Sequence, residues 1–213
     1  MQEEKKKALP PGTSDFLGEK AEIQQGNLRV LYVGGIGAHY QLHTLFDVVR
    51  NNKFVTLFVC VPEQQWADLE HEYSGLLAEN IKVVHYYGPA LEKLFLKTDL
   101  CSLFVAPSDY RAFAAPVKLY DYIGHHKPVI ATKGTLAGDF VSTNGCGWTI
   151  EYDQEQLADL LTYLSQNPEE VETYQSNVAD LAVLHTWKAR AQQVVQDAER
   201  ISVRYSSSRT VRK

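Results

Sequence analysis

Apolar segments of the length of β-strands alternate with helical segments along most of this chain. The six apolar segments cover residues 28–34, 54–61, 81–88, 100–107, 128–132 and 148–152. Strands that alternate with helices require crossover connections, which place the strands parallel to one another in one sheet. Most of these segments are nearly continuous apolar runs, as expected when helices cover both faces of a parallel sheet. The pattern predicts an α/β fold with a Rossmann-like, doubly wound parallel sheet of about six strands.

The sequence divides into three regions. Residues 1–27 contain the turn Pro10-Pro11-Gly12 and few apolar side chains, which indicates a linker or amino-terminal extension. Residues 28–205 are expected to form the Rossmann-like domain, with a helical carboxy-terminal segment from Gln154 onward. Residues 206–213 are polar and are expected to be a disordered tail. Within the domain we expect helices at 41–50, 62–80, 90–98 and from Pro116, and a loop at 108–115.

The composition excludes several classes of protein. A chain of 213 residues that is 45% hydrophobic can bury a core of ordinary size. A formal net charge of -5 argues against nucleic acid as a partner. The three cysteines, Cys60, Cys101 and Cys146, are widely spaced, so they predict neither a disulfide framework nor a zinc site, and a reducing cytoplasm fits them best. The longest apolar run is too short to cross a bilayer, and the charged amino terminus does not resemble a signal peptide.

A ligand site is expected at one edge of the sheet. In doubly wound sheets, ligands bind beyond the carboxyl ends of the strands, where the strand order reverses. The loop after the first strand contains three glycines, which let backbone N–H groups approach a phosphate: Gly34, Gly35 and Gly37. The alternative is a tight turn that needs glycine for its geometry. The loop does not complete the dinucleotide fingerprint, and no acidic residue ends the second strand, so NAD is not expected.

The helix that begins near Pro116 carries two charged residues on one face, Lys118 and Asp121. The positive end of the helix dipole repels a cation in the first turn, so the position of Lys118 requires a reason. Free amides, the dipole and the lysine together form a positive site that suits a diphosphate. Asp121 could accept hydrogen bonds from sugar or ribose hydroxyls. The alternative is that Asp121 only pairs with Lys118 along the helix.

The segment "PVKLYDYIGHHKPVIAT", residues 116–132, resembles a signature of the large retaining group of GT-B glycosyltransferases, "PxKLxEYxAxGKPVIAT". Spacing matches as well as residue type, because the acid stands seven positions before Pro128 and the lysine three before the acid. "LRVLYVGGIG" is similar to the opening strand and glycine loop of that family. "ALPPGTSDF" is similar to the linker that enters its carboxy-terminal domain. The resemblance spans roughly residues 9–198.

The resemblance implies the donor-binding half of a hexosyltransferase-type enzyme that uses a nucleotide-diphosphate sugar, of UDP or GDP, in polysaccharide or glycoconjugate biosynthesis. No metal or other cofactor is expected. Lys118 would hold the diphosphate and Asp121 the ribose, and these are the two catalytic-site candidates. The glycine loop would approach the phosphates or sugar, and Tyr87–Gly88 would flank the base. The further candidates for donor binding are His39, Asp109, Arg111, Pro116 and Val117.

The sequence departs from the family pattern in three places. Many members have an arginine and a lysine just after the glycine loop, where this chain has Ala38-His39-Tyr40-Gln41. The glutamate that meets the donor sugar in that family is Phe113 here, and Asp109 and Arg111 are candidates to replace it. The acid itself is Asp121 rather than a glutamate. His39 and His43 also have the spacing of a metal-binding pair on a helix, but no third ligand stands near them.

Two alternatives to an enzyme of this kind stay open. The departures at Phe113 and 38–41 favour a non-catalytic, GT-B-like accessory subunit that regulates a partner transferase. A nucleotide-sugar epimerase-like domain is the weaker option. In the transferase interpretation, an amino-terminal half absent from this chain would bind the acceptor, a glycan or lipid-linked glycan, so the chain alone would be inactive. The basic tail is compatible with peripheral attachment at the inner face of a membrane.

Overall fold

The structure is a computed structural model that describes residues 9–14, 22–37, 39–114 and 116–210. Its centre is one sheet of six parallel strands in the order β3-β2-β1-β4-β5-β6. The strands are β1 (Leu28–Val33), β2 (Val55–Cys60), β3 (Ile81–Val84), β4 (Leu100–Leu103), β5 (Val129–Thr132) and β6 (Gly147–Ile150). This architecture confirms the Rossmann-like, doubly wound fold predicted from the alternation of apolar and helical segments.

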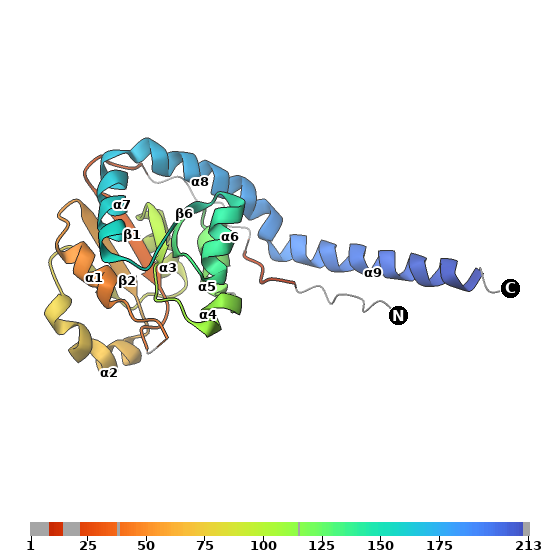
Figure 1. Ribbon diagram of the computed structural model, residues 1–213, viewed down its shortest axis with the longest axis horizontal. Helices are drawn as coiled ribbons and strands as arrows, with labels where there is room; N and C mark the ends of the chain where they lie inside the picture. Colours follow the sequence, from red (N-terminus) through yellow and green to blue (C-terminus); the bar gives the residue numbers. More distant parts are fainter. Residues whose placement is uncertain (1–8, 15–21, 38, 115, 211–213) are drawn as a thin grey trace.

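Helices cover both faces of this sheet (Figure 1). In chain order the helical elements are α1 (His43–Arg50), α2 (Glu63–Tyr73), η1 (Ser74–Leu76), α3 (Pro89–Leu96), α4 (Asp109–Phe113), α5 (Val117–Gly124), α6 (Leu136–Asn144), α7 (Gln154–Gln166), α8 (Pro168–Ala182), η2 (Val183–His185) and α9 (Trp187–Thr210). None of the helices in the described ranges combines the length and the apolar character that crossing a bilayer requires.

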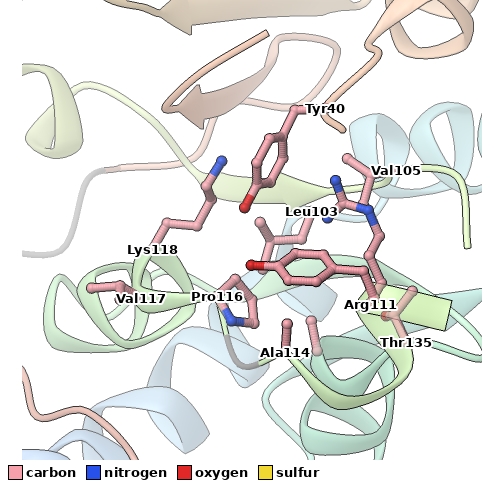
Figure 2. A pocket seen from close by; sticks show the side chains of 11 residues that line it. Tyr40, Leu103, Val105, Arg111, Ala114, Pro116, Val117, Lys118 and Thr135 are labelled. Atoms are coloured by element: carbon pink, nitrogen blue, oxygen red, sulfur yellow. The ribbon is translucent and has the colours of Figure 1, made fainter. Parts of the chain in front are cut away.

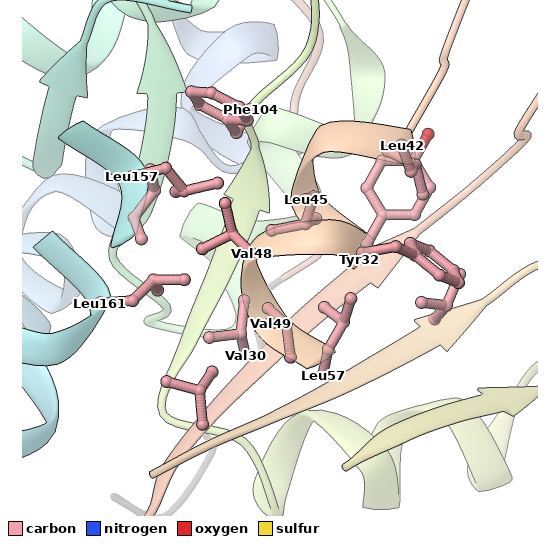
Figure 3. Close-up of a cluster of buried hydrophobic side chains, with 14 of the residues drawn as sticks. Val30, Tyr32, Leu42, Leu45, Val48, Val49, Leu57, Phe104, Leu157 and Leu161 are labelled. Carbon is pink, nitrogen blue, oxygen red and sulfur yellow. The ribbon is translucent and has the colours of Figure 1, made fainter. Parts of the chain in front are cut away.

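The core consists of two apolar clusters, one on each face of the sheet. Successive side chains of a strand point to opposite faces, so Val30 and Tyr32 enter one cluster and Leu31 enters the other. Figure 3 shows the first cluster, in which side chains of α1 and α7 lie over β1 and β2. The second cluster joins the sheet to α3, α5, α6 and α8. Each fully buried aliphatic side chain contributes roughly 1.5–3 kcal/mol, so the two clusters fix the positions of the helices.

The strand order reverses between β1 and β4. From β1 the chain adds β2 and β3 on one side, and it then returns to place β4 on the other side of β1. The loops that follow β1 and β4 therefore leave the sheet in opposite directions and open a crevice between them. The glycine loop lies at one side of this crevice, and the segment that holds α4 and leads into α5 lies at the other.

Several local expectations need correction. Pro116 is the N-cap of α5, with φ -72° and ψ 121°, rather than its first helical residue. Residues 108–115 were expected to be a loop, but Asp109–Phe113 form the short helix α4. The helix expected from residue 41 begins at His43, so His39 does not share a helix face with it. His43 instead stacks on Tyr73, with ring centroids 4.4 Å apart, which removes the metal-binding pair.

The two ends of the chain also differ from a simple linker and tail. Thr13 donates its N–H to the carbonyl of His185 at 2.8 Å and accepts from the N–H of Trp187 at 3.0 Å. The Thr13 side chain packs so closely on Gly124 that a Cβ at that glycine would collide with it. At the other end, α9 continues to Thr210 and projects from the domain (Figure 1), so the helix extends into residues 206–210 of the expected tail. No proline or glycine interrupts these residues, and 211–213 lie outside the described part.

Candidate functional site

Lys118 lies in the first turn of α5, at the crevice beside β1. Leu119, Tyr122 and Ile123 anchor this helix in the second core cluster. The Lys118 ammonium is consequently directed at the end of β1, where its Nζ donates a hydrogen bond to the Tyr32 hydroxyl at 2.9 Å. The same Nζ lies 3.9 Å from the centroid of the Tyr40 ring, a cation–π contact (Figure 2). The lysine tip is thus enclosed by aromatic rings rather than directed into solvent.

The charge of Lys118 is poorly compensated in this position. Burial, and then the positive charge of Arg111, lower the pKa of Lys118 to about 7. Among the ion pairs of the described residues, none includes Lys118, so the local pair with Asp121 that was considered as an alternative is not formed. An anion that entered the crevice would restore the ammonium, because an opposite charge favours the protonated form.

The glycine loop closes over the Lys118 ammonium. Gly34 has φ +132°, and a Cβ at this position would lie 2.5 Å from Lys118 Nζ. The backbone conformation therefore requires glycine, and a Cβ would also force the tip of Lys118 to move. The Tyr32 hydroxyl, which accepts from Lys118, donates in turn to the carbonyl of Gly35. The lysine, the tyrosine and the loop backbone form one hydrogen-bonded chain.

Gln65 of α2 holds the rest of the glycine loop in place. Its side-chain oxygen accepts the N–H of Ile36 at 3.0 Å. A Cβ at Gly35 would lie 2.9 Å from that oxygen, and one at Gly37 would lie 3.3 Å from the Gln65 nitrogen. Gly35 and Gly37 thus allow the loop to pack directly on α2. Part of the glycine content serves the geometry of the loop, as the tight-turn alternative expected.

Lys118 separates two cavities, which we call the first and the second cavity. The first has a volume of about 250 Å³ and is lined by Tyr40, Leu103, Val105, Tyr110, Arg111, Ala114, Pro116, Val117, Lys118, Thr135 and Ala137. The second has a volume of about 240 Å³ and is lined by Thr13, Ser14, Val33, Leu91, Glu92, Phe95, Lys118, Asp121, Tyr122 and His125. Lys118 lines both cavities, so a ligand that filled both would pass this residue.

The second cavity contains Asp121 together with an ordered histidine. The Nε2 of His125 lies 2.7 Å from a carboxylate oxygen of Glu92, and its Nδ1 lies 2.6 Å from the backbone carbonyl of Asp121. The His125 ring also stacks on Phe95, with centroids 3.8 Å apart and an interplanar angle of 9°. These contacts fix the wall beside Asp121, whose own side chain is exposed to solvent.

The first cavity contains Arg111, and it does not contain Asp109. Arg111 is only 9% exposed, and its Cζ lies 4.3 Å from the centroid of the Tyr40 ring. Asp109, on the same short helix, is exposed and does not line the cavity. Phe113 is 72% exposed and packs edge-on against Tyr110. Of the two candidates to replace the family glutamate, the structure brings only Arg111 into the cavity.

The remaining predicted residues lie at different distances from this centre. Pro116 and Val117 line the first cavity. His39 is exposed at its edge, with its ring centroid 6.0 Å from that of Tyr110. Tyr87 is 83% exposed, and Gly88, with φ +53°, is the N-cap of α3; neither lines either cavity.

Sequence reasoning did not identify Tyr32, Tyr40 or Gln65 as site residues. Tyr32 lies inside an apolar strand, where an aromatic residue is interpreted as core, and Tyr40 and Gln65 stand in no recognisable motif. Among the described residues, no three His, Cys, Asp or Glu side chains gather as a metal site would require.

Comparison with known proteins places this geometry in a family. The sequence pattern of the family "Glycosyl transferases group 1" matches residues 27–167. A comparison with curated proteins found no match.

Three similar solved structures share the fold. HepE from Anabaena, solved in complex with UDP, matches with a TM-score of 0.65 at 18% identity, over 82% of this chain and 49% of that chain. Sucrose-phosphate synthase from Thermosynechococcus elongatus matches with a TM-score of 0.72 at 17% identity, over 91% of this chain and 52% of that chain. WaaG, a glycosyltransferase involved in lipopolysaccharide biosynthesis, matches with a TM-score of 0.59 at 18% identity, over 79% of this chain and 47% of that chain.

The chain spans about half the length of these structures. The TM-scores show a common fold, here a GT-B-type Rossmann-like domain, and at these identities they show the fold alone. The family match covers all six strands of the sheet and both cavity-forming segments after β1 and β4. The chain therefore belongs to the group 1 glycosyl transferases.

Proposed function

We propose that the crevice around Lys118 binds the diphosphate of a nucleotide-sugar donor. The observation that carries this proposal is the enclosed Lys118 ammonium, which lies against Gly34 at the start of α5 without an acidic partner in the described structure. A buried cation of this kind costs free energy unless an anion compensates it. A diphosphate supplies that charge, and the free N–H groups of the α5 terminus add further donors.

In this proposal the two cavities that Lys118 lines hold different parts of the donor. The nucleoside occupies the second cavity, where the carboxylate of Asp121 can accept hydrogen bonds from the ribose hydroxyls. The sugar occupies the first cavity, beside Tyr40 and Arg111. The diphosphate lies between them, and Lys118 and the helix terminus provide its positive charge. In support, HepE has been solved with UDP-glucose, and its fold is shared by this chain.

Lys118 can also assist the chemistry. Sugar transfer breaks the bond between the anomeric carbon and the diphosphate oxygen, and negative charge then develops on that oxygen. An ammonium already fixed at this position stabilises the leaving diphosphate more than the ground state, which is the requirement for catalysis. Asp121 contributes by holding the nucleoside, so that the diphosphate stays aligned with Lys118.

Transfer also requires an acceptor held against the donor in a cleft with little water. The chain spans about half the length of the similar structures, and in this proposal a second domain holds the acceptor glycan. The 213 residues alone would then bind the donor without transferring sugar. Transfer at an undiminished rate by this chain, measured beside the same protein carrying a second domain, would contradict this part.

Calorimetric titration of the chain with UDP, GDP and their sugars tests the proposal. Saturable binding of a nucleoside diphosphate supports it. The alternative is a non-catalytic accessory subunit, which is favoured by the exposure of Phe113 at the position of the family glutamate. The absence of binding at millimolar concentrations of both nucleotides would support that alternative and reject the donor site.

A further inference from the structure

Arg111 is a buried cation whose side chain lines the first cavity. The side chain is only 9% exposed, and its Nη2 has no hydrogen-bond partner in the described part of the chain. No ion pair among the described residues includes Arg111. A guanidinium carries several N–H donors and cannot lose its charge, so its burial without a partner is costly. An anionic ligand group is the simplest compensation.

Arg111 and Lys118 lie at different parts of the two cavities. Figure 2 shows the Tyr40 ring between the two side chains, and both cations contact that ring, the guanidinium Cζ at 4.3 Å and the ammonium Nζ at 3.9 Å from its centroid. Lys118 lies beside the glycine loop and also faces the second cavity, whereas Arg111 lines only the first. A diphosphate held at Lys118 therefore leaves Arg111 available for a second anionic group, on the sugar side.

The other residues of the first cavity make a neutral sugar a poor partner for Arg111. Among its described lining residues none is acidic, and most are aliphatic or aromatic. Thr135 already uses its hydroxyl, which donates to the carbonyl of Thr132 and accepts the N–H of Gly138. A neutral hexose would find the hydroxyls of Tyr40 and Tyr110 in this lining, but it would leave the guanidinium without a counter-charge.

We propose that the donor sugar of this protein carries a carboxylate, as in a nucleotide-diphosphate hexuronate, and that Arg111 is the residue that selects it. The planar guanidinium matches a carboxylate through two parallel N–H···O bonds, a geometry that a lysine does not reproduce. Tyr40 supports this role, because the ring packs against the guanidinium and limits its orientations. The inference rests on the proposed donor site and names its substrate class.

Calorimetric titration of the 213-residue chain with matched donors provides the test. UDP-glucuronate and UDP-galacturonate are compared with UDP-glucose and UDP-galactose, or GDP-mannuronate with GDP-mannose if GDP is the nucleotide bound. We expect the hexuronate to bind about tenfold more tightly or better, as for a hydrogen-bonded charge pair. Equal or weaker binding of the hexuronate overturns this inference but leaves the donor site intact. Failure of every nucleoside diphosphate to bind rejects the donor site as well.

The Arg111→Gln variant assigns the preference to one side chain. We expect it to abolish the preference for the hexuronate without weakening the binding of UDP or GDP, because loss of the guanidinium charge favours the ammonium form of Lys118. An equal loss for the free nucleotide would show that Arg111 binds the diphosphate, which overturns the inference. Arg111→Lys keeps the charge without the planar fork and should retain a reduced preference; it also serves if the glutamine variant does not fold. Arg200→Gln, at an exposed position on α9, is the matched control.

Discussion

The Lys118 ammonium and the Tyr32 hydroxyl are 2.9 Å apart, although one belongs to the first turn of α5 and the other to the centre of the sheet. The contact joins the start of a helix to β1 across the point where the strand order reverses. Tyr32 passes the interaction on to the backbone of Gly35. A ligand that moves the Lys118 ammonium would therefore also disturb the hydrogen bond that holds the glycine loop.

Replacing Lys118 with alanine should weaken the binding of a nucleoside diphosphate by roughly 1.5–3 kcal/mol, the range for hydrogen bonds to charged groups. The melting temperature should change little, because the substitution also removes a poorly compensated buried charge. Isothermal calorimetry and thermal unfolding measure the two effects. Lys133→Ala is the control, since Lys133 is exposed and pairs with Glu151. If UDP and GDP bind the Lys118→Ala variant as they bind the parent chain, the site is wrongly assigned.

Above neutral pH, the protein should take up a proton when it binds a nucleoside diphosphate. Burial and the charge of Arg111 lower the pKa of the free Lys118 to about 7, and a bound diphosphate raises it again. Affinity should therefore fall as the pH rises above about 7. Calorimetry at about pH 8 in buffers of different ionisation enthalpy measures the uptake. The Lys118→Arg variant should bind without this uptake, since arginine stays charged; identical proton uptake in both proteins would exclude Lys118 as its source.

Folding stability should respond to pH through the same group. The folded-state pKa of Lys118 is lowered from 10.5 to about 7, so between these values the unfolded chain binds more protons than the folded one. The contribution of Lys118 to stability is unfavourable at low pH and disappears as the pH rises through this window. Lys118→Met should consequently stabilise the chain more at pH 6 than at pH 10. Urea titrations at both values provide the comparison, and a gain independent of pH would contradict the shift.

Gly34→Ala should disturb the site without touching any charge. The Cβ would lie 2.5 Å from Lys118 Nζ, at a φ of +132° that alanine adopts only with strain. We expect a loss of roughly 1–3 kcal/mol in the free energy of unfolding and weaker nucleotide binding. Gly75→Ala is a suitable control, because a Cβ there meets nothing within 4 Å. Equal behaviour of the two variants would show that the loop does not need to approach the lysine.

Asp121→Asn should weaken the binding of the nucleoside without changing the binding of the diphosphate. The ribose contact does not depend on phosphate. The variant should therefore lower the affinities for UDP and for uridine by similar factors, about tenfold for lost hydrogen bonds to a charged group. Inorganic pyrophosphate should bind as before. Lys118→Ala should give the opposite pattern in the same calorimetric series. Unchanged nucleoside affinity in the Asp121→Asn variant would remove Asp121 from the ribose site.

The fold was accessible from the sequence because six apolar segments separated by helices admit few arrangements. The placement of Lys118 at the crevice also followed, since the rule for doubly wound sheets selects the helix start after β4. The contacts of Lys118 did not follow. Tyr32 has the pattern of an ordinary core residue, and its hydroxyl reaches the site only because β1 ends there. Tyr40 belongs to a loop whose path no periodicity defines.

The choice between Asp109 and Arg111 could not be made from sequence. They stand two positions apart, and only the orientation of the five-residue helix α4 directs one of them inward. The extent of α9 beyond residue 205 was likewise not predicted, because the residues up to Thr210 contain no apolar periodicity to support a helix, although they also contain no helix-terminating residue. In both cases the outcome depends on tertiary packing or on weak local preferences, which the sequence pattern does not express.

The close packing of Thr13 on Gly124 has a consequence for how this domain can evolve. A side chain larger than hydrogen at residue 124 is excluded by a segment that lies more than a hundred residues earlier in the chain. A larger residue at position 124 requires a smaller one at position 13, so relatives that keep this fold and carry a side chain at 124 should have lost the threonine at 13. The segment through which the chain enters the domain thus limits which residues can occur at the end of α5.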